Sequence, residues 1–307
     1  MNPHSTSEFA AIRDYYDNHS MADEIANNYL WPVDPTSSNP HSSPRNALIA
    51  AHNTVLLGQV GSGLHGVTTG GDDRDEMGVC IEPPSMTIPV TTNGQALFEQ
   101  YIYRSQPEGV RSGAGDLDLT VYSLRKWSAL AAQGNPTVLL LAFIPEQEIV
   151  IDSDIGADLQ SRRHMWLSRE VAHRFAGYLV SQRDQLLGVK SKKHTNRPEL
   201  VEQYGFDSKF AYHMVRLGLQ GVELLTTGRI TLPIPEPDRT WLQELRRGEH
   251  TKDEALDRAA HLLAELDHLA VHADLPEHPD RAAINRWLTD AYQQWWETNN
   301  LLGGSNG

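Results

Sequence analysis

The sequence predicts an α+β protein, with a small mixed sheet and its helices followed by a region built mainly of helices. Four segments between residues 54 and 123 are short, apolar and rich in β-branched or alternating residues, as in strands. From Ser123 onward the apolar residues change to the helical period. We therefore predict three parts: a helical and loop extension (1–45), a mixed α/β core (46–150) and a helical C-terminal region (151–300).

The first elements come from local composition. Residues 7–30 carry apolar side chains on a roughly helical period, which predicts one or two short helices. The Pro/Ser-rich segment 32–44 favours a loop, because proline removes a backbone donor and fixes φ. A short helix over 46–53 then leads into a buried strand, TVLLGQV (54–60), and a glycine-rich segment (61–71) follows it.

Later elements follow from alternation and helix stop signals. Three more strands are predicted at 76–82, 98–104 and 116–123, and the last alternates apolar and polar residues. A helix over 124–134 ends at Gly134, with a proline just beyond it. The remaining helices are expected at 166–187, 207–227, 252–272 and 280–297, with breaks at NRPELVEQYG and GRITLPIPEP.

Composition excludes several classes of protein. The 307 residues include 26 Lys+Arg and 40 Asp+Glu, and this charge of −14 disfavours a protein that coats duplex DNA. Residues 161–216 hold eleven Lys/Arg against five Asp/Glu, so this stretch either meets a polyanion or is a solvated helix face. One cysteine, Cys80, excludes an internal disulfide and a thiolate zinc site. Without a signal peptide or an apolar run of 18 residues, we expect a cytoplasmic protein with no membrane partner.

Three carboxylates are candidates for a metal site. Asp73 and Asp75 are two residues apart, so on a strand they point to the same side. A further strand would bring Asp118 beside them, although Asp116 lies on the same predicted face. Converging carboxylates repel one another unless a cation lies between them, and Mg²⁺ commonly shares such oxygen ligands with phosphates.

A phosphate-binding turn precedes these acids. Gly61 and Ser62 directly follow the first predicted strand, eleven residues before Asp73. Where such a turn opens a helix, its backbone N–H groups and the helix dipole favour an anion such as a triphosphate. The combination suits in-line attack on phosphorus. The alternative is an ordinary turn followed by a solvated acidic loop.

Here the sequence resembles a known family. GSGLHG and TTGGDDRDEMGV are similar to the Gly-Ser and Asp-x-Asp signature of the DNA polymerase β-like nucleotidyltransferases, in particular the predicted branch associated with RNA repair in bacteria and phages. Residues 118–143, 204–233 and 245–263 also resemble that branch, so the resemblance runs from about 50 to 270. It implies a polymerase β-like catalytic core at 46–150.

The resemblance also implies roles for the candidate residues. Gly61 and Ser62 would bind the β and γ phosphates of a nucleoside triphosphate. Asp73 and Asp75 would hold two Mg²⁺ ions, for which Mn²⁺ can substitute. Asp118 would share the metal nearest the attacking hydroxyl and help to deprotonate it.

A polar stripe lies on one predicted helix. Lys209, His213 and Arg216 are spaced i, i+4 and i+7, so they share one helix face. The resemblance implies that they bind the nucleotide or the acceptor, and the alternative is a solvent face paired with Asp207.

Two positions depart from the family pattern. His65 stands where the family often has an aromatic residue, and Asp72 stands where it often has a serine. An extra acid at position 72 would weaken triphosphate binding if it lay beside the metals.

The expected function is Mg²⁺-dependent transfer of a nucleoside monophosphate from a triphosphate to a hydroxyl, with release of pyrophosphate. RNA, either a tRNA or an RNA end, is the preferred acceptor, in a bacterial cell or a phage-infected host. The alternatives are nucleotidylation of a protein or small-molecule hydroxyl, and a non-catalytic nucleotide- or RNA-binding module. The nucleotide used and the oligomeric state are not determined by the sequence.

Overall fold

The computed structural model describes residues 31–34, 37–88, 97–107, 109–189 and 197–302. The helices predicted within residues 7–30 lie outside the described residues. No described helix combines the length and the apolar character needed to cross a membrane.

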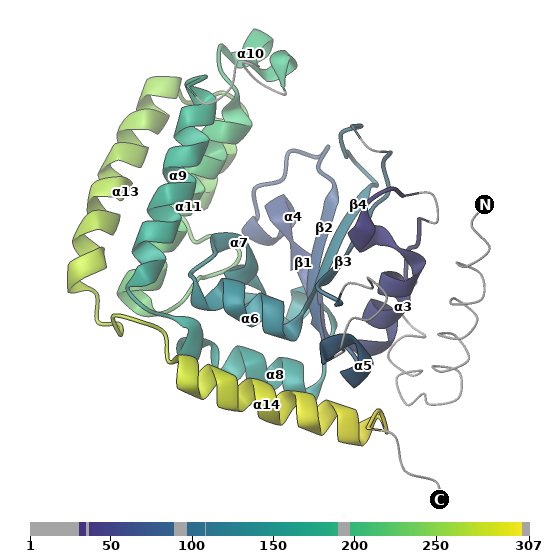
Figure 1. Ribbon diagram of the computed structural model, residues 1–307. Helices are drawn as coiled ribbons and strands as arrows, with labels where there is room; N and C mark the ends of the chain where they lie inside the picture. Colours follow the sequence, from purple (N-terminus) through teal and green to yellow (C-terminus); the bar gives the residue numbers. More distant parts are fainter. Residues whose placement is uncertain (1–30, 35–36, 89–96, 108, 190–196, 303–307) are drawn as a thin grey trace, which may run out of the picture.

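A five-stranded mixed sheet forms the centre of the molecule (Figure 1). Its strand order is β3-β4-β2-β1-β5, in which β2 and β4 are parallel and the other neighbours are antiparallel. The strands are β1 (Thr54–Val60), β2 (Arg74–Cys80), β3 (Gln100–Arg104), β4 (Leu117–Ser123) and β5 (Ile149–Ile151). The four predicted strands are confirmed, whereas the three-residue β5 was too short for its pattern to be recognised.

Helices surround the sheet and build the second half of the chain. The helices before residue 150 are α3 (Pro44–Asn53), α4 (Gly61–His65), α5 (Pro84–Thr87), α6 (Leu124–Ala132) and α7 (Pro136–Leu139). The later ones are α8 (Asp154–Ser161), α9 (Glu170–Leu186), α10 (Pro198–Tyr204), α11 (Ser208–Thr227), α12 (Asp238–Arg246), α13 (Lys252–His272) and α14 (Arg281–Thr298). Short 3₁₀ turns occupy Pro40–Ser42, Leu140–Phe143, Glu146–Glu148 and Arg163–Trp166.

The long predicted helices are confirmed, and three shorter ones correct the prediction. The segment NRPELVEQYG was predicted as a break, but it forms α10 with Pro198 in its first turn, where the missing proline N–H costs no hydrogen bond. Helices α8 and α12 were not predicted. The helix expected from residue 166 begins at Glu170, because Arg163–Trp166 is a separate 3₁₀ turn.

The two faces of the sheet carry two hydrophobic clusters. On one face α3 packs on Leu57, Leu119 and Val121, which confirms the alternation predicted for the strand at 116–123. On the other face the side chains of β1 and β2 continue into a large cluster that includes residues of α6, α9, α11, α13 and α14. Asp118 points to this second face, because it alternates with Leu119 along β4.

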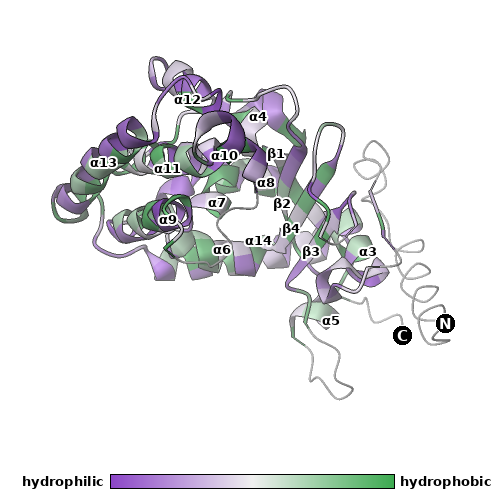
Figure 2. Cartoon of the chain, turned by 90° about the horizontal axis from the view of Figure 1, so that it is seen from above, coloured by the Kyte–Doolittle hydropathy of each residue, from purple (hydrophilic) through white to green (hydrophobic). Residues whose placement is uncertain are grey.

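Helices α9, α11 and α13 lie side by side next to the sheet, and α10 caps their upper end in Figure 1. Hydrophilic and hydrophobic residues both mark α13 in Figure 2, as expected of a helix with one buried side.

Helix α14 runs across the opposite end and returns the chain to the sheet (Figure 1). The indole N–H of Trp287 donates to Asp158 (2.7 Å), and that of Trp296 donates to the Glu82 carbonyl (3.0 Å). The indole N–H of Trp295 donates to Asn53 (3.2 Å), and the three tryptophans thus pack the last helix onto the body.

Candidate active site

The structure brings the three predicted acids together. Asp75 on β2 and Asp118 on β4 are directly paired across the parallel strands, and Asp73 lies just before β2. Carboxylate oxygens of all three lie within 4.8 Å of one another. Over the described part of the chain, this is the single group of three or more Asp, Glu, His or Cys side chains close enough to hold a metal ion.

Asp116, the alternative third acid, has a different place. It lies before β4, where its carboxylate accepts hydrogen bonds from the Gly113 amide (2.8 Å) and the Ser105 hydroxyl (2.9 Å). These bonds hold the pKa of Asp116 below its usual range. Asp116 therefore organises the turn that leads into β4, and Asp118 is the acid that joins the pair.

The electrostatics of the cluster fit a divalent cation. Burial raises the pKa of Asp75 to about 6, and the neighbouring carboxylates of Asp73 and Asp118 act in the same direction. Lys209 opposes them in part. Three half-buried carboxylates face two cations, Lys209 and Arg104 of β3, and form an oxygen-rich site in which a hard cation would remove the remaining repulsion.

The Gly-Ser turn lies against these acids. In the β1–β2 register Val60 is opposite Asp75, and Gly61 follows at once with φ of +73°. A Cβ on Gly61 would overlap the Asp75 carboxylate, so both the backbone conformation and the space require glycine. Gly61 and Ser62 open α4, and the chain leaves that helix through Gly66 in the left-handed region.

Asp72 is held away from a role as a fourth metal ligand. Its carboxylate accepts from the Thr69 amide (2.5 Å) and forms an almost fully buried ion pair with Arg246 of α12 (2.8 Å). Burial alone would raise the pKa of Asp72, but these partners and a hydrogen bond from Ser62 hold it below its usual range. The extra acid therefore ties the glycine-rich segment to the helical region.

The polar stripe of α11 faces the same end of the sheet. Burial lowers the pKa of Lys209, Arg197 acts in the same direction, and the carboxylate of Asp73 opposes them. Burial also lowers the pKa of His213 well below its usual range, with a further contribution from Arg216. Lys209 is thus the cation that α11 brings to the carboxylates.

Arg216 is half-buried, and its neighbours Tyr212 and Gln220 are buried. The Arg216 Nη1 donates to Gln220 (2.7 Å), while its buried Nε has no hydrogen-bond partner among the described residues. The same holds for the hydroxyl of Tyr212, which is 1% exposed. Asp207, the partner in the alternative of a solvent face, caps α11 and binds Arg197 (3.1 Å).

Two arginines of this end were not identified from the sequence. Arg246 lies 174 residues from Asp72, and Arg104 on β3 donates to Asp118 (3.1 Å). The unusual acid at position 72 signalled that a buried cation was needed, but no spacing rule identifies a partner so distant in sequence.

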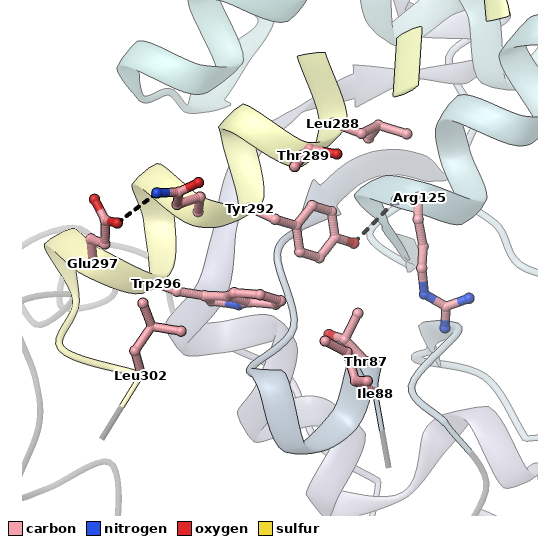
Figure 3. Close-up of a pocket in the computed structure, with 10 residues that line it drawn as sticks. Thr87, Ile88, Arg125, Leu288, Thr289, Tyr292, Trp296, Glu297 and Leu302 are labelled. Atoms are coloured by element: carbon pink, nitrogen blue, oxygen red, sulfur yellow. Dashed lines mark hydrogen bonds between the residues drawn. The ribbon is translucent and has the colours of Figure 1, made fainter. Parts of the chain in front are cut away.

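An apolar pocket lies elsewhere (Figure 3). It has a volume of about 560 Å³ and is lined by residues of α5 and α14, with Tyr292 and Trp296 on one wall. It is formed beside the ends of β2 and β4 remote from the three acids. Its polar groups already have partners, since Tyr292 donates to Glu82 (2.8 Å) and Arg125 binds the same carboxylate (2.8 Å).

The sequence model of a known family matches residues 44–290, a span that contains the glycine turn, the three acids and the polar stripe. The chain belongs to the RNA repair pathway DNA polymerase beta family. It is a nucleotidyltransferase, with a polymerase β-like core and a helical C-terminal region.

Comparison with solved structures finds a crystal structure of a nucleotidyltransferase-like protein from Exiguobacterium sibiricum 255-15. The similarity covers 79% of this enzyme and 74% of that chain, at 11% sequence identity and a TM-score of 0.25. Comparison with curated proteins gave no match.

Proposed function

We propose that the enzyme transfers a nucleoside monophosphate from a nucleoside triphosphate to a hydroxyl of RNA and releases pyrophosphate. The observation that carries this proposal is the direct pairing of Asp75 with Asp118, beside Asp73 and against Gly61. The proposed reaction needs groups that activate the acceptor and groups that bind the triphosphate, and both kinds must lie beside the same phosphorus atom.

Asp73, Asp75 and Asp118 are the residues that would hold two Mg²⁺ ions. When bound, the ions neutralise charge on the triphosphate and on the leaving pyrophosphate. The carboxylate oxygens are hard ligands of the kind that Mg²⁺ prefers, and Mn²⁺ takes the same ligands.

The chain also supplies groups for the triphosphate. The backbone N–H groups of Gly61 and Ser62 lie at the start of α4, where the helix dipole favours an anion. Lys209 lies close enough to Asp73 to interact with its charge, and Arg216 retains a buried Nε without a protein partner. We propose that Lys209, His213 and Arg216 line the nucleotide side of the site.

The chemical step is attack of the acceptor oxygen on the α-phosphorus. The new bond joins that oxygen to the α-phosphorus, and the bond from the α-phosphorus to the oxygen that bridges to the β-phosphorus breaks. That bridging oxygen leaves with pyrophosphate. Asp118 is the acid placed to take the proton of the attacking hydroxyl. Positioning and charge stabilisation supply most of the acceleration in such reactions.

RNA is proposed as the acceptor because the family description places its members in RNA repair. The lysines and arginines concentrated in residues 161–216 would face a polyanion better than the acidic remainder of the chain.

Label transfer tests the proposal. The protein is incubated with each α-labelled nucleoside triphosphate, Mg²⁺ and total cellular RNA, and an Asp73→Ala/Asp75→Ala variant is run in parallel. We expect label on RNA with the wild type and none with the variant. Addition of EDTA should abolish transfer, and Mn²⁺ should restore it.

The other outcomes are equally informative. Label on the protein itself, or on a small molecule, would replace RNA by that acceptor. Absence of metal-dependent triphosphate binding would contradict the proposed reaction.

A further inference from the structure

Four strands present one residue each along a single row across the sheet. Val60 of β1 pairs with Asp75 of β2, Asp75 pairs with Asp118 of β4, and Asp118 pairs with Arg104 of β3. Neighbouring strands are about 4.8 Å apart, so the four residues follow one another at that spacing from one side of the site to the other. The triphosphate turn follows Val60 at one end of the row, and Arg104 ends the other.

Arg104 contacts the third acid and still faces solvent. Its Nε donates to the Asp118 carboxylate (3.1 Å), and its Nη2 donates to the Ser112 hydroxyl (2.9 Å). The Ser112 hydroxyl lies 3.1 Å from both oxygens of Asp118, so the three groups form one cluster. The Arg104 side chain is 44% exposed, and its Nη1 makes no hydrogen bond to the residues that the structure describes.

In-line transfer assigns the two ends of this row to different partners. The attacking and leaving oxygens lie on opposite sides of the reacting phosphorus. If pyrophosphate leaves toward Gly61 and Ser62, the acceptor approaches from the side of β4 and β3. That side is where Arg104 lies.

We propose that Arg104 binds a phosphate of the acceptor, next to the hydroxyl that Asp118 faces. This inference rests on the proposed function and extends it to the chemistry of the acceptor. A planar guanidinium with one edge free suits a phosphodiester, which it can contact through more than one N–H. The acceptor class is then a nucleic-acid strand whose reacting hydroxyl is flanked by a phosphodiester, and not an isolated hydroxyl of a protein or a sugar.

Two other exposed arginines near this end of the sheet already have carboxylate partners outside the three acids. Arg111, in the segment between β3 and β4, pairs with Glu199 of α10 (2.5 Å). Arg74 pairs with Glu76 (2.6 Å). Arg104 is set apart because its carboxylate partner is itself part of the reacting site.

The test compares Arg104→Gln with Arg104→Lys and with a matched control. The probe is a short single-stranded RNA with a 3′-hydroxyl and a fluorescent 5′ end, whose binding is measured over a range of salt concentrations. The control is Arg286→Gln, because Arg286 is an exposed arginine of α14 that lies outside the basic stretch 161–216. Binding of a fluorescent triphosphate in Mg²⁺ is measured on every variant.

We expect Arg104→Gln to weaken RNA binding about tenfold, and to reduce the slope of log K against log[salt] by about 0.7, which is the loss of one phosphate contact. Arg104→Lys should keep the slope because it keeps the charge. Triphosphate binding should not change in either variant, and Arg286→Gln should behave as the wild type.

A merely structural role for Arg104 gives a different pattern. If the arginine only orients Asp118, Lys and Gln will both lower the transfer rate, and RNA affinity and its salt slope will stay at wild-type values. The variant Ser112→Ala removes a hydrogen bond to Asp118 without changing charge. It should therefore lower the transfer rate and leave RNA affinity and its salt slope at wild-type values.

Three results would overturn the inference: an unchanged salt slope in Arg104→Gln, an equal loss of triphosphate binding, or no RNA binding by the wild type. The label-transfer experiment separates these from failure of the proposed function. Transfer to RNA that is insensitive to Arg104→Gln rejects the phosphate contact alone. Transfer to a protein or a small molecule instead of RNA rejects the RNA acceptor and this inference together.

Discussion

The acids at the two ends of strands β2 and β4 differ in how far neighbouring cations balance their charge. At the start of these strands carboxylate oxygens of Asp73, Asp75 and Asp118 lie within 4.8 Å of one another, and the two cations beside them, Lys209 and Arg104, compensate only in part. At the far end Glu82 is fully buried, yet it has matched partners in Arg125 and Tyr292.

This difference separates function from stability. A buried carboxylate that is paired and hydrogen-bonded helps to specify one packed arrangement. Its oxygens already have protein partners, so they are not available to bind a ligand. Carboxylates that face one another without enough cations are costly in the isolated fold and persist where a cation or substrate completes them. The far end also carries an apolar pocket, whose polar groups are already paired.

The largest expected effect is on the unbalanced cluster. Asp75→Asn should lower the transfer rate by more than about a thousandfold, because several kcal/mol of charge stabilisation is lost. Its free energy of unfolding should be unchanged or higher, since the substitution removes repulsion from Asp73 and Asp118. Single-turnover kinetics and urea unfolding measure the two quantities. A clear loss of stability would mean that the cluster is structural.

The balanced cluster should respond in the opposite way. Glu82→Gln should reduce the free energy of unfolding by about 3 kcal/mol, because it leaves the Arg125 charge without its buried partner. Transfer activity should remain at temperatures where the variant is folded. Glu99→Gln is the control, since Glu99 also binds Arg125 but is 38% exposed, and its effect should stay below about 1 kcal/mol. Equal effects of the two variants would contradict this account.

Substitutions at two glycines with positive φ distinguish the effect of backbone strain from the effect of altered site geometry. Gly61→Ala adds both strain and an overlap with Asp75, so we expect transfer to fall about a hundredfold. Gly70→Ala adds comparable strain at φ of +85°, but nothing lies within 4 Å of its Cβ. It should cost about 1 kcal/mol of stability and leave the rate unchanged. A similar loss of rate in both variants would show that the glycine-rich segment acts through flexibility.

The smallest effect concerns a neutral histidine beneath the site. Burial lowers the pKa of His65 well below its usual range, so the unfolded chain binds a proton before the folded chain does. The contribution of His65 to stability is therefore complete above the unfolded pKa, about 6.5, and is lost as the pH falls below that value.

Between pH 7.5 and 5.5 the loss of stability should be smaller in His65→Asn than in the wild type by about 1 kcal/mol. Urea unfolding at the two pH values measures it. His278→Asn is the control, because His278 is 68% exposed. The account fails if the wild type and His65→Asn lose the same stability.

Local sequence determined much of this architecture. The four strands at 54–60, 76–82, 98–104 and 116–123 were predicted from apolar and alternating patterns, and all of them form. The long helices followed from their 3.6-residue period, because a side chain's position along a helix or strand depends mainly on its near neighbours. Short elements such as α10 and β5 were missed, since a few residues carry too little periodic signal.

The candidate site divides in the same way. The Gly-Ser turn and the pair Asp73 and Asp75 are local in sequence, and their spacing alone placed both acids on one side of a strand. Alternation left Asp116 and Asp118 on one face and the resemblance pointed to Asp118, which the register of β4 beside β2 pairs with Asp75.

Sequence by itself thus determined the order of the main elements, the family and the three candidate acids. Tertiary structure alone decided that Arg246 neutralises Asp72, that Lys209 approaches the carboxylates, and that Arg104 ends the row at β3. The physical reason is that charge pairing depends on distance in space, and residues up to 174 positions apart meet only when the sheet and α12 pack together.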